Sequence, residues 1–236
     1  MAHIAKHHQH VGNTYDESGL VTYGYDYELE RLEKHQPVEF AITKRYLQRY
    51  IPDGVTVADV GAGVGHFGEL LARRGCKIYL VDVAERLLAT AKARLVDAGF
   101  EQQILGVHHA SATDLSFLPD ACCDVVLLLG PLYHLDSAEE RQRALAEAVR
   151  ILRPAGLLFA AGINRMTWLN ALFNNEPDSV LEQRDFFERY IHDGRFYPPD
   201  LDSPGYVYLA TIEGFRSEFT AFTEIGLESP RHSCER

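Results

Sequence analysis

The stretch VADVGAGVGHFG, residues 57–68, constrains this chain more than any other. It begins with apolar residues typical of a buried strand, continues with three glycines that alternate with single residues, and ends in apolar residues at helical spacing. A glycine turn between a strand and a helix leaves backbone N–H groups and a helix N-terminus open to a ligand, because no Cβ blocks the approach. The stretch therefore predicts a site for a nucleotide-like cofactor.

Two kinds of cofactor site fit this turn. Residues 63–68, GVGHFG, match the G-x-G-x-x-G pattern of dinucleotide sites literally. Residues 61–65, GAGVG, which follow two residues after Asp59, instead resemble motif I of S-adenosylmethionine (SAM)-dependent methyltransferases. The first glycine comes directly after Val60, where the strand should end, and this register favours the second interpretation.

An acidic residue follows at the end of the next expected strand. Residues 76–83, CKIYLVDV, form an apolar run in which Asp82 lies 21 residues beyond Gly61. At this spacing a carboxylate at the tip of a strand accepts hydrogen bonds from ribose hydroxyls. SAM and NAD both contain a ribose, so Asp82 predicts a nucleoside but leaves the choice of cofactor open.

The order of predicted elements indicates an α/β protein with a doubly wound, Rossmann-like, mostly parallel sheet. Strand-like runs alternate with helical patterns, and the capping box Ser137-x-x-Glu140 marks one helix start. The turn at residues 153–156, RPAG, leads into the last of the central strands. The expected strands are 57–60, 76–83, 104–110, 125–129 and 157–161, with a further strand at 206–211 and a final helix at 212–225.

We expect a single domain built from four segments. An insertion at 163–205 follows the last central strand, at the edge of the sheet where ligands bind in open α/β folds, and is interpreted as part of a substrate cap. The segments are an N-terminal cap at 1–50, a cofactor-binding core at 51–162, the insertion at 163–205, and a C-terminal strand and helix at 206–236.

Composition excludes several classes of function. The net charge of −11 disfavours a nucleic-acid partner, since phosphate binding needs clustered lysine and arginine. The chain has no 18-residue apolar run and no apolar signal core at its start, so we expect a cytoplasmic protein without a membrane span. The four cysteines do not form a disulfide scaffold, and the histidine-rich residues 1–14 lack the ligand spacing of a metal site.

Taken together, the motifs resemble class I SAM-dependent methyltransferases over roughly residues 28–226. The glycine turn and Asp82 are joined by ATDL at 112–115, LLLGPLYHL at 127–135 and RPAGLLF at 153–159. The LLLGPLYHL form of this motif is similar to that of bacterial small-molecule methyltransferases. The resemblance implies methyl transfer from SAM to an O, N, S or C nucleophile of a small molecule by in-line displacement.

The resemblance also assigns site residues. Ser111 stands where family members often have aspartate, which replaces a charged hydrogen-bond acceptor near the adenine by a neutral one. The amino-acid part of SAM would contact Asp59, Gly61, Ala62, Gly63, Gly65 and Gly130, the ribose Asp82, and the adenine Val83, Ser111, Ala112 and Thr113.

The acceptor side is expected to follow the fourth central strand. Tyr133 and His134 lie there, and His134 is the candidate general base because an imidazole titrates near neutral pH. Aromatic residues of the two cap segments are expected to shape the acceptor pocket, namely Tyr15, Tyr23, Tyr25, Tyr27 and Trp168.

The C-terminus departs from the family pattern. Class I methyltransferases usually finish with a hairpin of two strands, yet only ten residues follow Gly226, and they carry no strand pattern. Either the hairpin is shortened, or residues 206–211 replace the edge strand, or a partner completes the sheet; we expect a homodimer or a covered edge. The other functions considered are an NAD-dependent oxidoreductase and a SAM-binding protein without catalysis.

Overall fold

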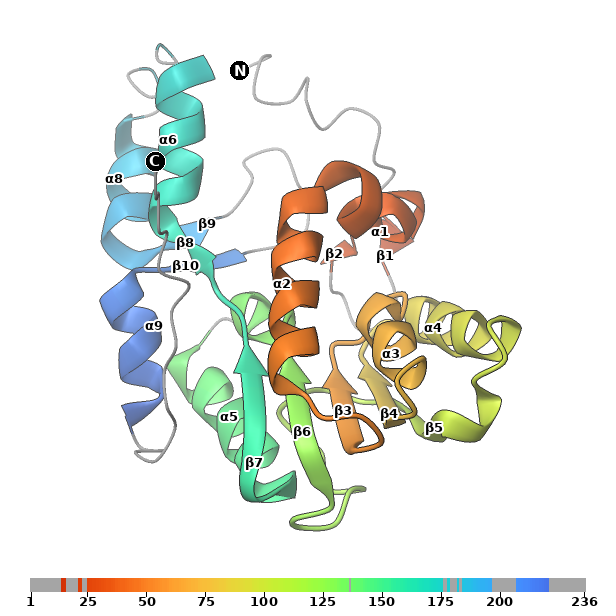
Figure 1. Ribbon diagram of the computed structural model, residues 1–236. Coiled ribbons are helices and arrows are strands. Elements are labelled where there is room, and N and C mark those ends of the chain that lie inside the picture. Colours follow the sequence, from red (N-terminus) through yellow and green to blue (C-terminus); the bar gives the residue numbers. More distant parts are fainter. Residues whose placement is uncertain are drawn as a thin grey trace, which may run out of the picture.

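The computed structural model describes residues 14–15, 21–22, 25–135, 137–175, 178, 182, 184–196 and 207–220. Its centre is a five-stranded sheet in the order β5-β4-β3-β6-β7 in which every pair is parallel (Figure 1). The strands are β3 (Thr56–Val60), β4 (Lys77–Asp82), β5 (Ile104–His109), β6 (Cys123–Leu128) and β7 (Leu152–Ala160). The order reverses between β3 and β6, so the sheet is doubly wound as the motif order predicts.

Alternate residues of the strands build two apolar cores, one on each face of the sheet. Val57, Val125 and Leu127 face one core, and their neighbours Ala58 and Val126 face the other. The first core is closed by α2 (Pro37–Tyr50), α3 (His66–Ala72) and α4 (Glu85–Asp97), and the second by α5 (Ala138–Ile151) and α9 (Ile212–Glu218). Burial on both faces explains why the central strands are continuous apolar runs.

The N-terminal helices extend above the carboxyl ends of the strands (Figure 1). Here α1 (Tyr25–Glu30) leads through one π-helical turn, η2 (Arg31–His35), into α2. Two short strands, β1 (Thr14–Tyr15) and β2 (Val21–Thr22), pair with each other ahead of α1.

Local sequence signals place most boundaries within a few residues. The predicted capping box is confirmed, because Ser137 Oγ accepts a hydrogen bond from Glu140 N while the Glu140 carboxylate accepts one from Ser137 N. Two single 3₁₀ turns, η3 (Glu101–Gln103) and η4 (Pro131–His134), follow α4 and β6. The η4 turn starts at the proline that stops β6.

Two boundary predictions are wrong. Residues 153–156 do not form a turn before the last central strand, since they lie inside β7. Ala155 has a φ of 63°, and the pairing with β6 shifts register between Cys123 and Val125, so the irregular backbone is accommodated within the strand. The final helix, α9, ends at Glu218 rather than at Ile225.

The C-terminal part forms a small second sheet. Its order is β8-β10-β9, from β8 (Ile163–Asn164), β9 (Arg195–Phe196) and β10 (Val207–Ala210). The helices α6 (Arg165–Asn175) and α8 (Arg184–Asp193) lie beside it in Figure 1, away from the central sheet. Of the three alternatives for the edge of the sheet, replacement by residues 206–211 is wrong, because β10 pairs with β8 and β9 and not with β7. No strand among the described residues pairs with the outer edge of β7.

Substitutions at two glycines with the same backbone conformation test how closely the glycine turn packs against α4. Gly65 has a φ of 80° and Gly54 a φ of 77°, so both Gly65→Ala and Gly54→Ala introduce strain of about 1–2 kcal/mol. A Cβ on Gly65 would lie 2.9 Å from Ala91 Cα on α4, whereas one on Gly54 meets nothing within 4 Å. We expect Gly65→Ala to lose a further ~1–3 kcal/mol of unfolding free energy in urea denaturation. Equal losses would contradict this packing.

Candidate functional site

The glycine turn joins β3 to α3 and is open on one side. Gly61, Gly63 and Gly65 all have positive φ, at 79°, 53° and 80°. A Cβ on Gly61 would lie 2.6 Å from Pro131 Cδ, so the turn packs directly against the start of η4. A Cβ on Gly63 would meet no atom within 4 Å. Gly63 therefore faces free space, in a conformation that side chains rarely adopt.

Asp82 ties this turn to the end of β4. Its Oδ2 accepts a hydrogen bond from Gly63 N at 2.7 Å, and its Oδ1 accepts one from Ala84 N at 2.8 Å. The carboxylate is only 8 % exposed. The carboxylate therefore joins the glycine turn to the residues that follow β4.

Asp59 lies deeper, beneath the same turn. Burial, and next the negative charge of Asp82, raise the pKa of Asp59 to about 7, while a hydrogen bond from the Gly68 backbone opposes the rise. Its Oδ2 is buried and has no hydrogen-bond partner among the described residues. A cofactor that brings a hydrogen-bond donor would relieve this unpaired oxygen.

The segment after β5 forms the next wall. Ser111 Oγ lies 2.9 Å from Thr113 Oγ1 and accepts a hydrogen bond from Thr113 N. Ala112 is buried between them. Val83, directly after Asp82, has its carbonyl oxygen 2.7 Å from His109 Nε2. The structure thus brings the predicted adenine residues to one edge of the sheet, next to Asp82.

Gly130, Tyr133 and His134 stand at the end of β6. The Tyr133 and His134 rings are 4.7 Å apart between centroids. A Cβ built on Gly130 would lie 3.7 Å from the Tyr133 hydroxyl and 3.9 Å from Gly61 O, so Gly130 lies between the tyrosine and the glycine turn. Burial, followed by the positive charge of Arg31, lowers the pKa of His134 to about 4. His134 is therefore uncharged at neutral pH.

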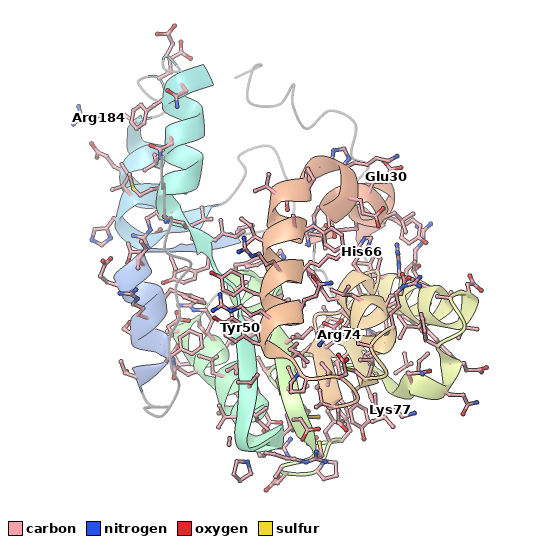
Figure 2. The ribbon with its side chains drawn as sticks, in the orientation of Figure 1. Glu30, Tyr50, His66, Arg74, Lys77 and Arg184 are labelled. Atoms are coloured by element: carbon pink, nitrogen blue, oxygen red, sulfur yellow. The ribbon has the colours of Figure 1, made fainter. Side chains whose placement is uncertain are left out.

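The N-terminal helices cover the site, and they supply residues that the sequence analysis missed. Leu29 packs on Val64 of the glycine turn and on the start of α4. Tyr25, on the same helix, has its hydroxyl 2.8 Å from Thr90 Oγ1 and its ring under the Arg86 guanidinium at 3.8 Å. Figure 2 shows His66 where α3 meets these helices, and its Nδ1 lies 3.5 Å from Glu33 Oε1.

These helices also carry a partly buried ion pair, whose two side chains are 23% and 16% exposed. Arg31 Nε donates to Glu28 Oε2 at 3.1 Å, and Arg31 Nη1 donates to Gln36 Oε1 at 2.7 Å. Burial raises the pKa of Glu28, and the nearby charge of Asp82 raises it further. Burial by itself would lower the pKa of Arg31. The interactions with Tyr133 and Glu28 outweigh this effect, so the pKa of Arg31 is raised. Glu28 therefore lies near the predicted ribose ligand, and Arg31 near the acceptor side.

One sequence signal points weakly to this pair: Glu28 and Arg31 are three residues apart, so a helix places them on one face. Several predicted acceptor-side residues cannot be placed. Tyr23 lies outside the described residues, and so do the side chains of Tyr15, Tyr27 and Trp168. Of the predicted tyrosine group, only Tyr25 has a described side chain, and it contacts α4.

His134 makes a pH prediction for stability. Its folded pKa of about 4 lies below the usual 6.5, so the unfolded chain binds more protons between these values, and the unfolding free energy falls as pH drops through this window. His134→Gln removes the pH dependence of the unfolding free energy that comes from His134. The pH dependence that comes from Asp59 is unchanged. Between pH 7.5 and pH 5, we expect the unmodified protein to lose about 2 kcal/mol more than the variant in urea unfolding. Parallel pH profiles would show that His134 is not a buried neutral imidazole.

Comparison with known proteins agrees with this geometry. Residues 58–160 match the family model described as a methyltransferase domain. A ubiquinone biosynthesis O-methyltransferase of Caulobacter vibrioides is 30% identical over 129 residues, which is 55% of this chain and 49% of that protein. The enzyme of the same name from Hydrogenovibrio crunogenus is 28% identical over 196 residues, or 82% and 73% of the two chains. The chain spans about half the length of the first curated relatives it matches.

A solved structure shares the fold. A SAM-dependent methyltransferase from Methanosarcina mazei superposes with a TM-score of 0.59 at 19% identity, covering 75% of this chain and 82% of that one. No helix within the described residues is both long and apolar enough to cross a bilayer. Residues 58–160 thus match a methyltransferase domain, and the sheet order and the glycine turn that Asp82 holds give this chain the fold of SAM-dependent methyltransferases of known structure.

Proposed function

We propose that this protein transfers a methyl group from SAM to a nucleophilic atom of a small molecule. One observation carries the proposal: Asp82 holds an open glycine turn at the point where the strand order reverses. Open α/β sheets bind ligands at this switch point. The residues present fit SAM, since the space beside Gly63 and the unpaired Asp59 Oδ2 suit a ligand that brings its own hydrogen-bond donors.

The predicted cofactor residues keep their roles in this proposal. Asp82 would accept the ribose hydroxyls, and residues 111–113 with Val83 would line the adenine. The backbone of the glycine turn and Gly130 would hold the amino-acid end. Asp59 is proposed to contact the amino-acid end from its buried position, where the Gly68 backbone donates a hydrogen bond to its carboxyl group. The division of the domain into segments 1–50, 51–162, 163–205 and 206–236 is also part of the proposal.

Bound SAM supplies a methyl group that is already activated by a positively charged sulfur. The protein's task is then to align the acceptor and to exclude water, and alignment can supply ~7–11 kcal/mol of the barrier. Leu29 and Tyr25, packed on Val64 and α4, support such a cover over the site. The ion pair Glu28–Arg31 adds charged groups to this cover without exposing them fully to solvent.

His134 is proposed to accept a hydrogen bond from the acceptor's X–H group. Its pKa of about 4 keeps the imidazole neutral, so a lone pair is available at neutral pH. The same low pKa makes it a weak proton acceptor. We infer that His134 orients the acceptor. It takes a proton only from an acceptor whose X–H group becomes strongly acidic as the methyl group is transferred. Tyr133, whose ring lies against His134, would form the wall next to the glycine turn.

An oxygen nucleophile has the most support among the acceptors, because the relatives at about 30% identity are named ubiquinone biosynthesis O-methyltransferases. The acidic balance of the chain disfavours a nucleic-acid acceptor.

A homodimer is also proposed, because the outer edge of β7 carries Leu157, which is 37% exposed. Light scattering that gives a monomer mass would count against it.

Asp82→Ala tests the cofactor. Because hydrogen bonds to a charged group contribute about 1.5–3 kcal/mol, we expect at least a tenfold loss of affinity for SAM and for S-adenosylhomocysteine in calorimetric titration. Asp97→Ala, at the exposed end of α4, is the matched control and should bind as the unmodified protein does. Binding of NAD but of neither sulfur nucleoside would refute the proposal and favour an oxidoreductase.

Two substitutions at one position separate the roles of His134. Turnover is measured as S-adenosylhomocysteine release on a panel of phenols, amines and thiols. His134→Ala should lower kcat by about 10²-fold or more with SAM affinity nearly unchanged, as the loss of a group that orients the acceptor predicts. His134→Gln, which keeps a hydrogen-bond acceptor, should recover much of that loss if orientation is its role. Unchanged kcat in both variants would remove His134 from the mechanism.

A further inference from the structure

Arg141 is the one buried arginine or lysine in the part of the chain that the structure describes. It lies near the start of α5, and its side chain is only 6% exposed. Removing a charged group from water costs free energy that is recovered only when the charge is paired and hydrogen-bonded. The contacts of this guanidinium group therefore indicate what its burial achieves.

The guanidinium group contacts three separate elements. Its Nη1 donates a hydrogen bond to Leu135 O at 3.0 Å, and its Nε donates one to Glu218 Oε1 at 2.6 Å. Its central carbon lies 3.7 Å from the centroid of the Tyr208 ring. Leu135 is the C-cap residue of η4, Glu218 is the last residue of α9, and Tyr208 lies in β10. One side chain of α5 therefore joins the turn after β6 to the C-terminal elements.

The turn η4 depends on contacts of this kind, because it has few of its own. It is a single 3₁₀ turn whose N-cap residue provides no side-chain hydrogen bond, and the internal hydrogen bonds of such turns have poor geometry. At its start, Pro131 Cδ lies only 2.6 Å from the position that a Cβ on Gly61 would take. At its end, Arg141 donates to the carbonyl group of Leu135, the residue directly after His134. The turn is thus held from outside at both ends.

Glu218 keeps the guanidinium group in this orientation. Its side chain is 11% exposed, and a second hydrogen bond, from Gln142 Nε2 to Glu218 O at 2.8 Å, also ties α9 to α5. Glu218 Oε2 is buried and has no hydrogen-bond partner among the described residues, which adds to the cost of burying the pair. Buried ion pairs seldom stabilise a protein more than apolar residues of similar volume would. A gain in stability is therefore a poor explanation of this pair, and a fixed orientation of Arg141 is a better one.

We propose that Arg141 is a positioning residue for methyl transfer: it fixes the end of η4 and thereby holds Tyr133 and His134 in place on the acceptor side. Glu218 and the Tyr208 ring in turn hold Arg141. The inference rests on the proposed function and extends the acceptor side to α9 and β10. A misplacement of about 1 Å in a catalytic site can lower the rate by about 10²-fold, so a support of this kind affects kcat.

Substituting both partners of the ion pair separates positioning from stability. In the double variant Arg141→Met with Glu218→Met, one charge of each sign is removed, so the fold should be retained while the hydrogen bond to Leu135 O is lost. The readout is the pKa of His134, followed by NMR titration of its imidazole in the full chain. This pKa should rise from about 4 toward its ordinary value of 6.5, because a displaced η4 exposes the ring to solvent. A pKa that stays at about 4 would overturn the proposal.

Arg141→Lys decides the same question if the double variant does not fold. Lysine keeps the positive charge beside Glu218, but its ammonium group cannot copy the planar fork that reaches Glu218 and Leu135 O together. The pKa of His134 should again rise, and an unchanged value would count against the proposal. Arg143→Met, at an exposed position on the same helix, is the matched control and should leave the pKa of His134 at about 4.

Turnover provides a second readout, with any phenol, amine or thiol that the unmodified protein methylates. Arg141→Lys should lower kcat by about 10- to 100-fold, with the affinity for S-adenosylhomocysteine nearly unchanged. A merely structural role would lower the fraction of folded protein and leave kcat per folded molecule as it is. If S-adenosylhomocysteine fails to bind even the unmodified protein, the proposed function fails, and the NMR titration still decides whether Arg141 holds η4. If it binds and neither the pKa of His134 nor kcat changes, only the positioning role fails.

Discussion

The hydrogen bonds that Asp82 accepts from Gly63 and Ala84 hold the site together. They join the glycine turn after β3 to the start of α4 after β4, so two crossover connections share one carboxylate. Close contacts at Gly61 and Gly65 complete the arrangement by pressing the turn onto η4 and α4. Because each contact needs a bare backbone, the turn tolerates little change in sequence.

Charge in the site is arranged around this carboxylate. Asp59 and Glu28 lie close enough to Asp82 for its charge to raise both pKa values, although burial is the larger cause. Arg31 offsets part of this negative charge and also keeps His134 neutral. The outcome is a site in which the acids, the arginine and the imidazole influence one another, as expected where solvent is largely excluded.

Much of the fold could be predicted because its signals are local. Continuous apolar runs mark the central strands, a capping box marks α5, and glycines mark the cofactor turn, since each depends on residues near one another in the chain. The RPAG segment carries a local signal that does not match its structure: proline and glycine usually indicate a turn, but pairing with β6 keeps residues 153–156 in the strand. Pairing across the sheet overrode the local preference.

By itself, the sequence determined the alternation of strands and helices, the glycine turn and the acid at the tip of β4, because local patterns and spacing along one chain specify each of them. Only the tertiary structure decided which groups meet across the site. Arg141 and Glu218 are 77 residues apart, and no pattern relates them, yet α5 and α9 bring them into one buried pair. Likewise, the neutral state of His134 depends on burial and on Arg31, a residue about a hundred positions earlier in the chain. Contacts of this kind arise from packing, which local sequence does not encode.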